Sequence, residues 1–116
     1  MTASESTFAP LRRRERQRRI AALRQRLRDT LGTNDCSVWL FGSLARGDWD
    51  GFSDTDLLVV AADKDAAERA ADQLIEALVG DDVMAIDQER WQAMDRSTSP
   101  HWRAIRAQAI RLHPEP

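Results

Sequence analysis

Leu40-Phe41-Gly42-Ser43 is followed, after ten further residues, by Asp54-Thr55-Asp56-Leu57-Leu58-Val59-Val60. Residues 38–41 are a short continuous apolar run, typical of a strand that is buried on both faces. A glycine directly after such a strand lets the backbone turn sharply and approach a ligand closely. Ser43 then opens a helical turn, whose free N–H groups and hydroxyl can hold phosphate oxygens. The first part of this pattern therefore predicts a phosphate-binding turn at the end of a buried strand.

The second part places two carboxylates at the start of another apolar strand, residues 55–60. Positions i and i+2 of a strand point to the same face. Asp54 and Asp56 would therefore repel each other unless a cation lay between them. Oxygen ligands of this kind suit Mg²⁺, which also takes water and phosphate oxygens. The pair predicts a magnesium site close to the phosphate-binding turn.

A third carboxylate follows one crossover later in the chain. Asp82 begins the apolar strand 82–86, and a predicted helix over 64–79 can bring this strand beside the first two carboxylates. Asp81 competes for the same position, and we favour Asp82 because it directly precedes four apolar residues. Three converging carboxylates would form a two-metal site, which clamps both oxygens of an in-line displacement at phosphorus. Because the sequence has no P-loop, we expect nucleotidyl transfer rather than γ-phosphoryl transfer.

Helices and strands alternate along the rest of the chain. Apolar residues at helical spacing predict a helix over 11–31, and further helices follow each of the last two strands. The last helix is expected to run into a terminal strand near residue 112. The pattern predicts one α/β or α+β domain over residues 10–116, with a small sheet covered by helices. Residues 1–9 lack an apolar period and are predicted to be a disordered tail.

The composition limits the classes of protein to consider. Of the 116 residues, 42% are hydrophobic and 31% are charged, as in ordinary globular proteins. No apolar run approaches the ~18 residues of a membrane span, and the first ten residues lack the core of a signal peptide. A single cysteine, Cys36, excludes an internal disulfide and a cysteine-based zinc site. We therefore expect a cytoplasmic protein with no membrane partner.

Charge is distributed unevenly along the chain. Residues 1–30 hold nine arginines and three acidic residues, a net charge of +6. Residues 31–116 hold eight basic and sixteen acidic residues, a net charge of −8. A basic helix on an acidic body can bind nucleic acid, bind an acidic partner protein, or pack on its own domain. The sequence leaves these three alternatives open.

The motif residues together resemble the polymerase-β-type nucleotidyltransferase superfamily, and more narrowly the minimal nucleotidyltransferases (MNT) of prokaryotes. The resemblance covers about residues 20–112. The matching residues are Gly42-Ser43, Leu44-Ala45-Arg46-Gly47, Ser53, Asp54-Thr55-Asp56, Asp82 with its four apolar successors, and Asp87-Gln88-Glu89-Arg90-Trp91. The chain departs from the commonest pattern at Leu44, where a polar or aromatic residue is frequent. The Arg-rich N-terminal helix is also unusual.

The resemblance implies the fold of that superfamily, a small mixed β-sheet flanked by helices. It implies that Gly42 and Ser43 bind a nucleoside triphosphate, and that Asp54 and Asp56 bind two Mg²⁺ ions. Asp82 would complete one metal site and help to activate the acceptor hydroxyl. Arg46 would reach a phosphate.

The resemblance also implies a partner. Minimal nucleotidyltransferases are often encoded beside a HEPN-domain toxin, and some act as antitoxins that transfer AMP from ATP to a tyrosine of that toxin. A homodimer or a partner chain could complete such a small site. The alternatives are an antitoxin that only binds, transfer to a small molecule, and transfer to an RNA end, which would draw on the arginines.

Other polar and aromatic residues are interpreted as structural. We expect core or interface positions for Trp39, Trp91 and Trp102, and solvated loop positions for Asp48 and Asp50. Asp87 is expected to be a helix N-cap. Surface positions are expected for His101 and His113, and an inert thiol for Cys36. Trp49 is the exception, because an aromatic residue in a polar loop could pack on a base or on a partner.

Overall fold

Four strands form a single sheet in the order β3-β2-β1-β4. The structure, a computed structural model, describes residues 3–47 and 54–115. Its strands are β1 (Cys36–Phe41), β2 (Asp56–Ala61), β3 (Asp82–Asp87) and β4 (Ile110–His113). Its helices are α1 (Ala3–Leu31), α2 (Ser43–Arg46), α3 (Lys64–Glu76), α4 (Gln88–Ala93), a 3₁₀ turn (Met94–Arg96) and α5 (Pro100–Gln108).

The sheet is mixed, as expected. β1 runs antiparallel to both β2 and β4, whereas β2 and β3 are parallel and are joined through α3. In the β1–β2 register Phe41 lies opposite Asp56, and in the β2–β3 register Asp56 lies opposite Asp82. The pairing of three strands therefore brings residues from distant parts of the sequence to one end of the sheet.

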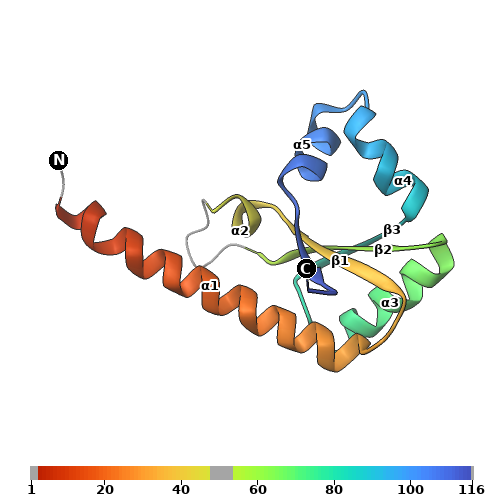
Figure 1. Ribbon diagram of the computed structural model, residues 1–116, viewed down its shortest axis with the longest axis horizontal. Coiled ribbons are helices and arrows are strands. Elements are labelled where there is room, and N and C mark those ends of the chain that lie inside the picture. The colour runs from red at the N-terminus through yellow and green to blue at the C-terminus, as the bar shows by residue number, and fades with distance from the viewer. Residues whose placement is uncertain (1–2, 48–53, 116) are drawn as a thin grey trace.

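Helices cover the two faces of the sheet separately (Figure 1). One face packs against α1, α2 and α3, and its core includes Val38, Leu40 and Leu57. Leu44, which departs from the family pattern, is fully buried in this core. The other face packs against α4 and α5. Its core includes Leu58 and other strand residues that alternate with those of the first face. Successive side chains of β1 and β2 point to opposite faces of the sheet, and this alternation decides which residues face α5.

The N-terminal helix differs from its expected start. α1 begins at Ala3, so residues 3–9 are helical instead of a disordered tail, and Pro10 lies inside the helix. The expected start rested on apolar periodicity, which residues 3–9 do not have. From Ile20 onward the expected apolar face is confirmed, and Leu27 is fully buried.

Several arginines of α1 bond to the rest of the chain. Arg26 donates to the carbonyl oxygens of Ala77 at 2.7 Å and Leu78 at 3.2 Å. Arg28 forms an ion pair with Glu115. Packing on its own domain is therefore one use of the basic helix.

Two N-cap aspartates stabilise helix starts. Asp63 accepts from the N–H of Ala66 at 2.8 Å, and Asp87 accepts from that of Arg90 at 2.7 Å. The cap interpretation of Asp87 is thus confirmed.

The aromatic side chains pack largely as expected. Trp91 is buried, and its ring centroid lies 4.7 Å from that of the half-buried Trp39. His113 was expected at the surface, but it is buried in β4, where burial and then the Arg28 charge lower the pKa of its imidazole. The residues Asp48, Trp49, Asp50 and Ser53, for which expectations were also drawn from the sequence, lie outside the described residues.

Across residues 3–47 and 54–115, none of the helices combines the length and the apolar character that a membrane crossing requires.

Leu27→Ala should destabilise the protein by about 2–5 kcal/mol, because it leaves a cavity between α1 and the sheet. Leu11→Ala is the matched control, since it makes the same change on the same helix at a side chain that is 53% exposed. Denaturant unfolding of both variants checks this expectation. A Leu27→Ala loss no larger than the control's would contradict the packing of α1 against the sheet.

Candidate active site

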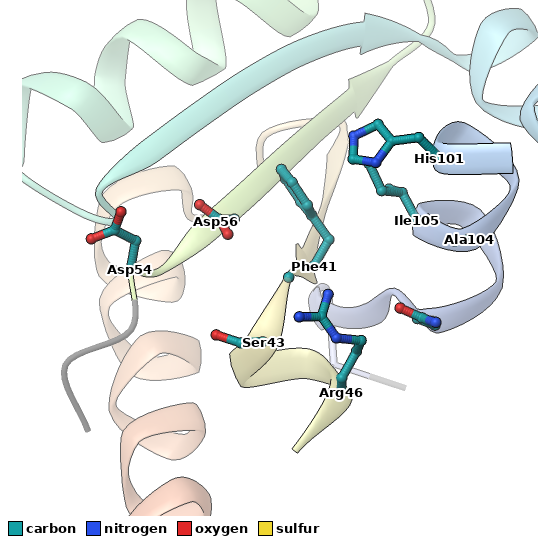
Figure 2. A pocket seen from close by; sticks show the side chains of 10 residues that line it. Phe41, Ser43, Arg46, Asp54, Asp56, His101, Ala104 and Ile105 are labelled. Atoms are coloured by element: carbon teal, nitrogen blue, oxygen red, sulfur yellow. The ribbon is translucent and has the colours of Figure 1, made fainter. Parts of the chain in front are cut away.

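A pocket of about 420 Å³ opens between the end of β1, the start of β2, and α5. Figure 2 shows Asp54 and Asp56 on one side of it, the α5 residues on the opposite side, and Ser43 and Arg46 of α2 between them. Its lining comprises Phe41, Gly42, Ser43, Arg46, Asp54, Asp56, His101, Ala104, Ile105 and Gln108. Five of the six residues singled out from the sequence thus line one pocket, and Asp82 is not among its lining residues.

The backbone at Gly42 has a conformation that other residues avoid. Its φ is 80° and its ψ is −162°, a region occupied almost only by glycine. A β-carbon at this position would lie 2.3 Å from Oδ2 of Asp56. The glycine therefore lets the Asp56 carboxylate lie directly against the turn that begins α2.

The Asp56 carboxylate lies among other carboxylates at this end of the sheet. Burial raises the pKa of Asp56, and the negative charges of Asp82, Asp54 and Asp81 raise it further, while the Arg46 charge lowers it. Asp56 and Asp82 are opposite each other on parallel neighbouring strands, so their side chains leave the same face of the sheet. The negative charge that the sequence predicted is therefore concentrated here.

The structure separates the roles of the two adjacent aspartates Asp81 and Asp82. The Asp81 carboxylate accepts from the Thr55 N–H at 2.7 Å, and the Asp81 N–H donates to the Thr55 carbonyl oxygen at 2.9 Å. Asp81 thus holds Thr55, the residue before β2, in position through two hydrogen bonds. Asp82 has an exposed side chain and is the residue in register with Asp56.

The donor set has the chemistry that a magnesium ion requires. Within the described residues, no three His, Cys, Asp or Glu side chains are grouped closely enough to hold a metal ion. Mg²⁺, however, is usually bound through one or two carboxylates and takes its remaining ligands from water and substrate phosphates. Asp54 and Asp56 line the pocket together, and the mutual repulsion that raises the pKa of Asp56 is what a cation would relieve.

The opposite wall of the pocket was not anticipated. It is lined by His101, Ala104, Ile105 and Gln108 of α5. His101 is exposed, as expected from the sequence, and its place in the pocket wall is the new observation. These residues recur at intervals of three and four, which places them on one face of a helix. That periodicity was visible in the sequence, but nothing local indicated that this face is opposite Asp54.

Comparison with known proteins identifies the domain. Residues 20–96 match the nucleotidyltransferase domain family. The chain belongs to that family. The match includes β1, α2, β2 and β3, and it confirms the resemblance to nucleotidyltransferases.

Solved structures similar to this nucleotidyltransferase include a crystal structure of a toxin–antitoxin with AMP-PNP, at 28% identity. That similarity covers 75% of this chain and 67% of the other, with a TM-score of 0.42. A mutant of the toxin–antitoxin MntA-HpeT is similar at 26% identity over the same shares, with a TM-score of 0.41. No curated protein shows significant sequence similarity to the chain.

Gly42→Ala should abolish nucleotide binding and destabilise the fold by about 1–3 kcal/mol, because the backbone is strained and the β-carbon displaces the Asp56 carboxylate. Gly32→Ala is the control, since Gly32 also has a positive φ (56°) but has no neighbouring atom within 4 Å of the added carbon. Calorimetric titration with AMP-PNP and thermal unfolding check the pair. Unchanged affinity in Gly42→Ala would contradict the close approach of the turn and the carboxylate.

Asp56→Asn should raise the midpoint of thermal unfolding at pH 7 in EDTA. Because the pKa of Asp56 is higher in the folded protein than its ordinary value of 3.8, the ionised carboxylate destabilises the fold. That penalty is absent below the ordinary pKa and develops as the pH rises through the raised one. The gain should therefore disappear near pH 3.5, and a variant less stable than wild type at pH 7 would contradict it.

Proposed function

We propose that this nucleotidyltransferase moves AMP from ATP to a hydroxyl group of a partner protein, with Mg²⁺ held by Asp54 and Asp56. One observation carries the proposal: Asp54, Asp56 and the Gly42-Ser43 turn line a single pocket, with the Asp56 carboxylate directly against Gly42. A site that joins carboxylates with a glycine–serine turn suits the binding of a metal-bound triphosphate.

Each residue of the pocket has a role in the proposed transfer. Ser43 and Arg46 hold phosphate oxygens through the hydroxyl and the guanidinium, which presents several N–H donors to an anion. Bound Mg²⁺ would neutralise the charge of the phosphates and orient them. The α5 wall, with Ala104 and Ile105, supplies apolar surface for the nucleoside.

The reaction is a displacement at the α-phosphorus. The acceptor oxygen forms a bond to this phosphorus, and the bond from the phosphorus to the bridging oxygen breaks, so that pyrophosphate leaves. The proton of the acceptor hydroxyl passes to a carboxylate. Asp82 is suited to this role because it is exposed and is in register with Asp56 at the same end of the sheet.

We further propose that the partner is a HEPN-type toxin and that the transfer neutralises it. This part rests on the resemblance of the motif to the minimal nucleotidyltransferases. A toxin that is only bound, with no transfer, is the competing function, and the metal-site variants distinguish the two.

Asp54→Asn and Asp56→Asn should each lower the transfer of AMP at least about a hundredfold, because each weakens the binding of the Mg²⁺ that would stabilise the negative charge of the transition state. Asp72→Asn is the matched control, since it makes the same change at an exposed position of α3. The assay combines the chain with Mg²⁺, ATP and the neighbouring gene's product, and intact-mass spectrometry detects an AMP-sized adduct.

Full transfer by either active-site variant would overturn the proposed mechanism. Equal neutralisation of the partner by Asp56→Asn and wild type, with no adduct in either, would establish the binding-only function instead.

A further inference from the structure

Two arginines of α1 bond to the segments that carry the pocket residues, although neither arginine lines the pocket itself. One bonds to α2, and the other bonds to the residue between Asp54 and Asp56. Arg16 donates from Nε to the carbonyl oxygen of Leu44 at 2.8 Å, and from its terminal nitrogen to that of Ala45 at 2.9 Å. Both acceptors belong to α2, the short helix that carries Ser43 and Arg46. One guanidinium therefore binds two successive carbonyl groups, a fork geometry that restricts both distance and orientation.

One turn further along α1, Arg19 contacts the segment that carries Asp54 and Asp56. Its terminal nitrogen donates to Oγ1 of Thr55 at 2.9 Å, and Thr55 is only 4% exposed. Thr55 lies between Asp54 and Asp56, and its N–H also donates to the Asp81 carboxylate. The residue between the two carboxylates is thus held by its side chain and by its backbone.

The two hydrogen bonds from Arg16 are important for the position of α2, because this helix is very short. A helix of four residues has almost no stability of its own, so contacts outside the helix decide its position. Hydrogen bonds from a charged donor are stronger than those between neutral groups. The Arg16 fork is therefore a principal restraint on the turn that carries Ser43.

We propose that Arg16 and Arg19 are positioning residues, which hold the phosphate-binding turn and the metal-binding carboxylates at a fixed separation. The inference rests on the proposed function and extends it to α1, outside the pocket. It assigns separate effects to the two arginines: Arg16 governs the affinity for nucleotide, and Arg19 governs the affinity for the metal ion.

The test measures the two affinities separately on the full chain. AMP-PNP with saturating Mg²⁺ reports nucleotide binding by calorimetry, and Mn²⁺ alone reports metal binding through the loss of its free electron spin resonance signal. Arg16→Ala should weaken AMP-PNP binding about tenfold, equivalent to about 1.4 kcal/mol, and leave Mn²⁺ binding within twofold. Arg19→Ala should weaken Mn²⁺ binding by a similar factor. Arg13→Ala, at an exposed position of the same helix, is the control and should change neither.

Two further measurements separate positioning from a general loss of stability. Arg16→Lys keeps the charge and most of the stem, but one ammonium cannot reproduce the fork. We therefore expect AMP-PNP binding between that of wild type and that of Arg16→Ala, with a smaller fall of the unfolding midpoint than in Arg16→Ala. Hydrogen exchange at the N–H groups of Arg46 and Gly47, which bond to Gly42 and Ser43, should accelerate in Arg16→Ala and not in Arg13→Ala.

The outcomes distinguish the two proposals. Wild-type protein that binds no AMP-PNP would overturn the proposed function and this inference with it. Wild-type binding that Arg16→Ala and Arg16→Lys leave unchanged would overturn this inference alone. Equal weakening of both ligands by both arginine variants, in proportion to lost stability, would also overturn it, because the arginines would then be merely structural.

Discussion

Close contact between a glycine backbone and a carboxylate is the constraint on which this site depends. Gly42 directly follows β1 and Asp56 begins β2, and the antiparallel register, which pairs Phe41 with Asp56, brings the two together. No side chain can stand between them, because even a β-carbon would overlap the carboxylate oxygen. The Gly42-Ser43 turn and the acidic residues are therefore parts of one junction, whose geometry is determined by strand pairing.

The rest of the fold has to stabilise an unfavourable concentration of charge. Burial and neighbouring carboxylates disfavour the ionised form of Asp56, so the site lowers the stability of the metal-free protein. Two hydrophobic cores, one on each face of the sheet, oppose that cost. A ligand that brings a cation to this end of the sheet would gain binding energy from charge repulsion already present in the folded chain.

Local chemistry made the strands, the N-caps and the motif residues predictable. An apolar run predicts a strand, and a cap such as Asp87 acts within three residues. The contacts of Arg16 and Arg19 were not predictable, because these residues are separated from their partners by 28 to 36 positions. The α5 wall is still further along the chain from Asp54 and Asp56. For the same reason, charge alone left open whether the basic helix binds nucleic acid, another protein or its own domain. The start of α1 was misplaced because residues 3–9 have no apolar face to indicate a helix.

β3 lies at the edge of the sheet, and the acidic residues at its two ends therefore have a second effect. β3 is the last strand on its side, so within the described residues its backbone is paired on one edge only. Unpaired strand edges promote aggregation with other chains, and charged side chains are a common protection against it. Asp82 and Asp87 stand at the two ends of this strand. Asp82, which is in register with Asp56, thus also places a negative charge at the open edge of the sheet, where charge opposes pairing with another chain.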